Sequence, residues 1–292
     1  MSVLEKTAPE AVGAAEPLRD DRITTIRPAT RMPKLELREL WHYRELATTF
    51  VWRDLKVRYK QTFIGVLWVV LQPLLTTVIF TLIFGRFADF PSDDLPYPIF
   101  VLAGVLPWTY FSTSLNGASS SIAGNRALVT RVYFPRVLLP IGAIITPLVD
   151  FLVAFPVLVA MIFYFDIPVG VEALLAPLFL LLAATTALGV GLLFAVANVR
   201  YRDVPYAIPF VINIWMYLSP VIYPVNALED RYQWLLSFNP MTAVITGLRW
   251  SLLGASRPSA TVIGVGTATA IALLLAGLAA FRSAEPRFAD TI

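Results

Sequence analysis

The 292-residue chain contains no cysteine and only one histidine, His42. The absence of cysteine excludes a disulfide framework and thiolate metal sites. Charged side chains are also scarce, at 15% of residues, whereas 57% of residues are hydrophobic. This balance is too apolar for an ordinary soluble domain of this length, so most of the chain is expected to lie in lipid.

Long apolar stretches account for this composition. Because a membrane-spanning helix needs about 20 predominantly apolar residues, six stretches qualify as spans: 63–84, 98–121, 137–163, 173–199, 205–223 and 260–281. They are continuous, unlike the short alternating segments of a transmembrane barrel, and a helix satisfies its own backbone hydrogen bonds in lipid. The sequence therefore predicts an all-α integral membrane protein with six transmembrane helices within residues 61–284.

The positive charges indicate how these spans are oriented. Residues 1–62 hold twelve of the 23 Lys and Arg residues, and seven more fall in the 122–136 and 200–204 loops and the C-terminal tail. The remaining loops hold only Arg86, Arg231, Arg249 and Arg257 and collect most of their charge as Asp and Glu. By the positive-inside tendency, both termini and the second and fourth loops face the cytoplasm. Topology explains the basic balance, so no nucleic acid partner is expected.

Features of enzymes and of ion-driven carriers are missing. No G-x-x-x-x-G-K-[ST] loop occurs, so the chain is not expected to cradle the phosphates of ATP. A membrane-embedded transferase would need paired carboxylates or a metal cluster near the cytoplasmic surface, but Asp20–Asp21 lies in the N-terminal tail and Asp93–Asp94 on the predicted outer side. We therefore expect no catalytic residue, no metal site and no cofactor bound by this chain.

One charge does fall inside a predicted span. Asp150 lies in the middle of the third span, where a carboxylate costs about 2.5 to 3.5 kcal/mol on insertion scales and usually points into protein or water. We expect a buried hydrogen bond to a neighbour such as Asn116 or Asn213. Proton coupling is the alternative, although the spans contain no Lys, Arg or His that could complete a relay.

The cytoplasmic N-terminal region divides into two parts. Residues 1–33 show no periodicity and are predicted to form a mobile tail; residues 285–292 are predicted to form a cytoplasmic C-terminal tail. In residues 34–60, polar side chains recur every three or four residues, which predicts an amphipathic helix in the headgroup layer. It is either an anchor or a gate beside a side entrance for a lipid-linked molecule. The candidate gate residues are Arg38, His42, Arg53, Lys56, Arg58 and Tyr59.

Two loop regions carry further signals. The basic segment within 121–140 either sets topology alone or receives a cytoplasmic partner. On the outer side, residues 222–254 predict two short re-entrant helices before the last span, the first begun by a capping box at Asn226 and Glu229 and the second capped at Asn239-Pro240. These helices are too short to form a seventh span.

Five ordered motifs resemble those of ABC type-2 permeases from polysaccharide export systems, the family that includes O-antigen, capsule and teichoic acid exporters. The first motif is "RDLKVRY" at 53–59, followed by Gly65, Trp68 and Pro73. The others are "RVYFPRVLLP" (131–140), "NVRYRDV" (198–204), "SPVIYPV" (219–225) and "NPMTAVITGLR" (239–249). The resemblance extends from about residue 34 to residue 282.

This resemblance implies a homodimeric permease in the bacterial inner membrane. Its partners would be two copies of a nucleotide-binding ATPase subunit, which binds ATP and Mg, and its substrate an undecaprenyl-linked glycan. The family places ATPase contacts on the second and fourth loops, where Arg126, Arg131 and Arg202 are the candidates. An ABC exporter of a small hydrophobic molecule or drug, and a non-ABC carrier or channel, stay open as alternatives.

A channel for a glycan needs flat aromatic surfaces, because sugar rings present faces of C–H groups. The resemblance favours the first and fifth spans as channel lining. The candidate channel residues are Trp68, Trp108, Tyr110, Phe111, Trp215, Tyr217 and Tyr223. Ordinary core packing is the alternative role for each of these aromatic side chains.

Overall fold

The computed structural model describes residues 41–60 and 65–288, and every regular element in these ranges is helical. The predicted N-terminal tail and gate residue Arg38 lie outside the described residues. The longer helices are α2 (Arg44–Lys60), α3 (Gly65–Phe80), α4 (Tyr97–Gly124), α6 (Leu138–Tyr164), α7 (Ala176–Arg200) and α11 (Ala260–Ala284). The shorter ones are α5 (Arg126–Arg131), α8 (Val204–Tyr217), α9 (Asp230–Ser237) and α10 (Pro240–Leu253). A π-helical turn, η1 (Thr81–Phe87), extends α3.

Within the described ranges, five helices are long and apolar enough to cross a membrane. They are Leu67–Phe87, Tyr97–Gly124, Leu138–Tyr164, Val171–Arg200 and Ala260–Arg287, and they coincide with the predicted first, second, third, fourth and sixth spans. The predicted all-α architecture is thereby confirmed for the described residues, and the five helices are consistent with an integral membrane protein.

The predicted fifth span differs from the prediction. Its helix, α8, ends at Tyr217 after 14 residues, so it is about 21 Å long at 1.5 Å per residue, against roughly 30 Å of hydrocarbon. Apolar residues continue to Tyr223, but Pro220 cannot continue the helical hydrogen bonding and disfavours helix at the residue before it. The Ser219 hydroxyl instead donates to the carbonyl of Trp215, 2.8 Å away. Hydropathy alone therefore overestimated this helix.

Helix α4 forms the centre of the bundle and packs against α3, α6, α7 and α10. Helix α7 in turn packs closely on α11. At this crossing a Cβ on Gly189 would lie 2.6 Å from the backbone nitrogen of Leu274, closer than real contacts allow. Glycine therefore permits the close approach of these two helices, as small residues do in membrane bundles.

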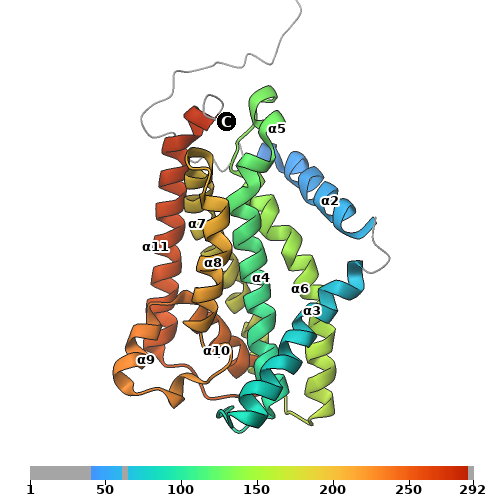
Figure 1. Ribbon diagram of the computed structural model, residues 1–292, viewed down its shortest axis with the longest axis vertical. Coiled ribbons are helices and arrows are strands. Elements are labelled where there is room, and N and C mark those ends of the chain that lie inside the picture. The colour runs from blue at the N-terminus through green and yellow to red at the C-terminus, as the bar shows by residue number, and fades with distance from the viewer. Residues whose placement is uncertain (1–40, 61–64, 289–292) are drawn as a thin grey trace, which may run out of the picture.

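The two ends of the bundle carry different loops. Figure 1 shows α5, the start of α2 and the end of α11 at one end, and α9 and α10 toward the other. These are the segments that the charge distribution assigned to the cytoplasmic and outer sides, respectively. Their separation agrees with the predicted topology, although the side of the membrane that each end faces stays a prediction.

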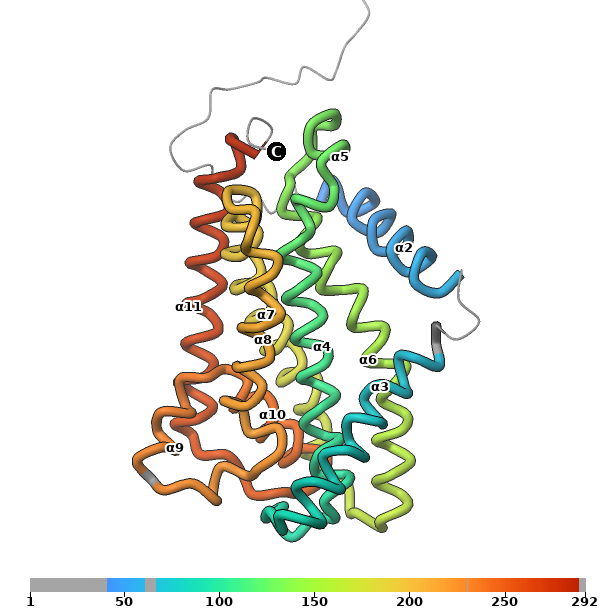
Figure 2. The backbone as a smooth tube through the Cα atoms, in the orientation of Figure 1, coloured from blue at the N-terminus to red at the C-terminus, as the bar shows by residue number. Residues whose placement is uncertain are grey.

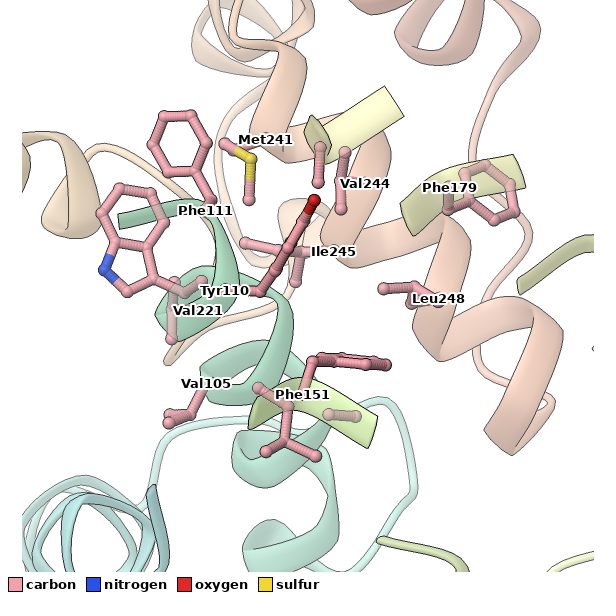
Figure 3. Packing of buried hydrophobic residues seen from close by; sticks show 14 of the residues in the cluster. Val105, Tyr110, Phe111, Phe151, Phe179, Val221, Met241, Val244, Ile245 and Leu248 are labelled. Atoms are coloured by element: carbon pink, nitrogen blue, oxygen red, sulfur yellow. The ribbon is translucent and has the colours of Figure 1, made fainter. Parts of the chain in front are cut away.

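Helix α10 fills the bundle near the α9 end. Twelve of its 14 residues are buried, and Figure 3 shows Met241, Val244, Ile245 and Leu248 among the packed side chains of the core. The predicted cap is confirmed, because the Asn239 side chain accepts a hydrogen bond from the backbone nitrogen of Met241 at 3.0 Å.

The predicted capping box before α9 is wrong. Glu229 occupies the cap position without a side-chain bond, and the Asn226 amide instead donates to Oδ1 of Asp93 at 2.7 Å. Asn226 therefore binds the loop between α3 and α4. A local sequence pattern does not reveal a contact with so distant a residue.

Candidate functional site

Helix α2 packs on protein through the side that was predicted to be apolar. Figure 2 shows it running obliquely beside α6, from the α5 end toward the start of α3. Phe50 is 6% exposed and its ring lies 5.7 Å from that of Phe134, while Tyr43 and Ala47 pack against the same buried cluster. Trp52 remains exposed. The apolar side of α2 therefore anchors this helix to the bundle.

The last turn of α2 is held by the carboxylate of Asp150. Arg58 forms an ion pair with Asp150 Oδ2, and the Tyr59 hydroxyl donates to Asp150 Oδ1. The expected partner, Asn116 or Asn213, is therefore wrong: the partners come from α2, which lies far from Asp150 in the sequence. Burial, and then the hydrogen bond to this carboxylate, raise the pKa of the Tyr59 phenol above its ordinary value.

Two cavities adjoin this cluster. One, of about 460 Å³, is lined by Trp68, Gln72 and Asp150 among others. The other, of about 510 Å³, reaches Arg53 and Asn125 toward the α5 end. Both are bordered by Arg58, Thr113 and Pro147, so they are neighbours and together form a depression in two parts between α2, α3, α4 and α6. We call this depression the gate groove.

The gate groove has two chemical characters. Its α5 end is the more polar of the two, with Arg53, Asp54, Ser120 and Asn125 in its lining. Its other end is mostly apolar and aromatic, lined by Trp68, Val69, Pro73, Leu106, Tyr110 and Phe151. A molecule with a charged group joined to a long apolar part would match this order.

A side-chain contact connects α2 with α5. Nη2 of Arg53 donates to Oδ1 of Asn125 at 3.2 Å, and the Asn125 amide donates to the carbonyl of Ser121 at 2.8 Å. Asn125 is the residue at which α4 ends and α5 begins. Helix α2 is thus bound both to the start of α5 and to the middle of α6.

The candidate coupling residues lie on the surface. Arg126 and Arg131 are exposed on α5, and Arg202 is exposed in the turn between α7 and α8. Val129 is buried and seats α5 on the bundle. Arg136, not singled out from the sequence, binds the end of α11: its backbone nitrogen donates to Oε1 of Glu285 at 3.0 Å.

The candidate channel aromatics divide into buried and exposed groups. Trp108, Tyr110 and Phe111 are at most 5% exposed in the core, as Figure 3 shows for Tyr110 and Phe111. Trp215 is half-buried, and its indole nitrogen donates to Oδ1 of Asn239 at 2.9 Å. Tyr223 is also partly buried. Trp68 and Tyr217 are the two whose side chains are more than half exposed. A channel role stays a prediction for all seven.

Arg249 is the main polar residue that sequence reasoning missed. It was counted among the outer cations, yet it is 2% exposed within α10. Its guanidinium donates to the carbonyls of Phe100 (3.0 Å), Pro220 (2.7 Å) and Val221 (2.5 Å). It also lies 3.5 Å from the centre of the Phe100 ring. Arg249 therefore connects α10 to α4 and to the turn after α8. An Arg within an otherwise apolar helix was the signal in the sequence that could have indicated this role.

The five long apolar helices and the central position of α4 define a multi-pass membrane protein, with the gate groove between α2, α3, α4 and α6. The chain belongs to the ABC-2 type transporter family, whose model matches residues 45–253. It is therefore an ABC permease of the bacterial inner membrane, and membership implies an ATPase partner subunit.

Three relatives illustrate the similarity. The chain is 31% identical over 260 residues to the O-antigen export system permease protein RfbA of Myxococcus xanthus, covering 88% of this chain and 98% of the relative. It is 26% identical over 241 residues to the protein of the same name from Klebsiella pneumoniae, covering 82% and 92%. It is 23% identical to the polysialic acid transport protein KpsM of Escherichia coli, covering 80% and 91%.

Proposed function

We propose that this chain is the transmembrane subunit of an ATP-driven exporter of an undecaprenyl-linked polysaccharide of the O-antigen, capsule or teichoic acid type. The polysaccharide would move from the cytoplasmic to the outer face of the inner membrane. The observation that carries the proposal is the gate groove, with its polar end near α5 and its apolar end along α3. The relatives are named as O-antigen export permeases and as a polysialic acid transport protein, and these names support a polysaccharide as the substrate.

The groove matches the chemistry of a lipid-linked glycan at its phosphate linkage. Guanidinium groups bind phosphate oxygens in a bidentate manner, and Arg53 and Arg58 line the groove. The lipid tail would remain against the apolar end beside Trp68. Because Arg58 is paired with Asp150, an arriving phosphate competes with Asp150 for this guanidinium. Substrate binding would then loosen the end of α2 and open the side entrance.

ATP hydrolysis would be supplied by two copies of the partner ATPase, each binding ATP and Mg. We place their contacts on α5, through Arg126 and Arg131, and on the α7–α8 turn, through Arg202. A push on α5 reaches α2 through the Arg53–Asn125 hydrogen bond. This contact would link nucleotide-driven movement to the gate helix.

The route through the membrane would be enclosed by a second copy of the chain. The most apolar part of α3 and η1 is only 11% buried, and α8 exposes Phe210, Ile214 and Tyr217. Pairing of these faces in a homodimer would cover them and place Trp68 and Tyr217 beside the passing glycan. In this arrangement the six helical segments of each copy serve as its six spans, with α8 completed by the turn that follows it.

Site-specific photo-cross-linking in proteoliposomes tests the proposal. A photoreactive residue replaces Trp68 in the gate groove, and the control replaces Leu178 on α7; the two native side chains are similarly exposed, at 55% and 60%. With the ATPase present, radiolabelled undecaprenyl diphosphate glycan should label position 68 and not position 178, and should become accessible outside only when ATP is added.

Two outcomes would contradict the proposal. Equal labelling at the two positions would remove the groove as the entrance. ATP-driven movement of a hydrophobic dye, together with no movement of the glycan, would favour the exporter of small hydrophobic molecules.

A further inference from the structure

A second depression lies at the end of the molecule opposite α5. It has a volume of about 370 Å³ and is bordered by α9, α10, the start of α11 and the loop before α4. Small-molecule pockets occupy roughly 300 to 1,000 Å³, so this cavity is large enough for a small ligand. None of its lining residues takes part in the gate groove. We call it the outer cavity.

The lining of the outer cavity is rich in hydrogen-bonding groups of both kinds. Asp93 supplies a carboxylate, Asn226 an amide, and Ser237 and Thr246 supply hydroxyls. The Asn226 amide and the Asp93 carboxylate are held together by a hydrogen bond of 2.7 Å. The Ser237 and Thr246 hydroxyls donate to carbonyls of their own helices, so their oxygens serve as acceptors, and the second hydrogen of the Asn226 amide serves as a donor. This arrangement suits ligands carrying several hydroxyl groups.

One wall of the outer cavity is aromatic. The Trp234 side chain is 59% exposed, and its ring packs edge-on against Phe238 at 5.5 Å between ring centres. A hexose has one face of C–H groups and a rim of hydroxyls. A flat indole beside carboxylate, amide and hydroxyl groups matches both parts of such a ring.

The outer cavity offers a phosphate ligand no pair of available guanidinium groups. Arg249 lines it, but this buried guanidinium donates to three backbone carbonyls. Arg257 is exposed, with its guanidinium carbon 5.3 Å from the Trp250 ring centre. Asp93 adds a carboxylate of opposite charge. A neutral sugar requires no cluster of positive charges, so this mixed lining suits it better than an anion.

We infer that the outer cavity binds a neutral sugar residue of the glycan chain as the chain leaves the protein. Its place in transport rests on the proposed function, whereas its affinity for sugar does not. Holding one emerging sugar residue would oppose backward slippage of the chain between cycles of ATP hydrolysis.

Saturation-transfer NMR on the permease in lipid nanodiscs, without the ATPase, tests the inference. The probes are the methyl glycosides of glucose, galactose, mannose and rhamnose. We expect transfer to the ring C–H protons of at least one glycoside. Trp234→Ala should weaken its binding about tenfold, the effect of losing one stacked aromatic ring, and Asn226→Ala should weaken it as well. The matched control is Trp52→Ala, which removes a similarly exposed tryptophan from α2, outside the lining of either cavity, and should leave transfer unchanged.

Several outcomes would overturn the inference. One is the absence of transfer to all four glycosides. Another is transfer in the Trp234 and Asn226 variants that equals transfer in the parent protein. A third is displacement of the glycoside by pyrophosphate. Both variant positions are exposed, so unchanged thermal unfolding would exclude misfolding as the cause of a loss. Failure here with successful ATP-driven glycan export would reject the outer cavity alone. Sugar binding without export would reject the proposed function and leave the outer cavity standing.

Discussion

Replacing Asp150 with Asn should release the end of α2 from α6. The substitution removes the charge that pairs with Arg58 and leaves the Tyr59 hydroxyl a neutral, weaker acceptor in place of a carboxylate, while preserving the size of the side chain. The loss should therefore reflect the interaction and not a cavity. Because the two contacts hold the last turn of α2, we expect local detachment of this helix with the bundle intact.

The magnitude follows from the exposure of the pair. The Asp150 side chain is 18% exposed and that of Arg58 is 38% exposed. Exposed ion pairs contribute about 0.2 to 1 kcal/mol, whereas breaking a fully buried pair costs about 3 to 5 kcal/mol. An intermediate pair with an added hydrogen bond to a charged acceptor should contribute about 1 to 2 kcal/mol after allowance for solvent screening. That corresponds to roughly a five- to thirtyfold change in the ratio of docked to detached α2.

Distance measurement between spin labels provides the assay. The chain has no cysteine, so cysteines for labelling can be introduced at Trp52 on α2 and Leu152 on α6 without removing any native one; both side chains are exposed. Double electron–electron resonance should give one narrow distance distribution in the parent protein and a broad, longer one in Asp150→Asn. The control is Asp54→Asn, which breaks the exposed Arg53–Asp54 pair and should change the distribution little.

A charge exchange decides whether the ion pair is responsible. Asp150→Arg combined with Arg58→Asp reverses the pair and should recover part of the narrow distribution. An unchanged distribution in Asp150→Asn, or equal broadening in the Asp54 control, would refute the reasoning.

Four further outcomes follow from the described contacts. Asn125→Ala should leave ATPase activity intact and lower glycan export per ATP severalfold, since it removes the acceptor of Arg53; unchanged coupling would contradict the α2–α5 link. Arg249→Met should lower the unfolding free energy by about 3 kcal/mol or more, because three buried carbonyls lose their donor. Intrinsic tryptophan fluorescence during heating would detect this loss, and Arg249→Lys should restore stability only in part. Gly189→Leu should prevent the α7–α11 contact and give aggregated protein in size-exclusion chromatography, whereas Gly264→Leu, at a site with open space around it, should not. Cross-linkers at positions 126 and 131 should capture the ATPase; capture confined to the C-terminal tail would defeat the assignment of α5 as its docking site.

Hydropathy predicted most of the fold because it reads a property of whole segments. Five predicted spans coincide with long helices, and the cap at Asn239 was visible because a cap is local. The fifth span was overestimated since apolarity persists beyond the point where Pro220 ends α8. Composition does not register that loss of backbone hydrogen bonding.

The candidate site was harder to predict, because its contacts join distant parts of the chain. Arg53 was found from its helical spacing and Arg58 from its place in the motif at 53–59, but their partners Asn125 and Asp150 lie 72 and 92 residues away. Arg249 illustrates the same limit: its charge suggested a loop facing water, whereas three carbonyls of other segments hold it in the core. Spacing identifies a face of a helix and not what that face meets.

Burial differs sharply between the central helix α4 and the peripheral helix α3. The most apolar window of α4 is 78% buried, and that of α3 with η1 is 11% buried. Because α4 packs against α6, α7 and α10, its displacement would disturb the whole core, whereas displacement of α3 would break few contacts within its own chain. A bulky polysaccharide could then pass by displacement of α3 alone, so the energy needed for each transport cycle would be set by the few side chains that hold α2 and α3 to the bundle.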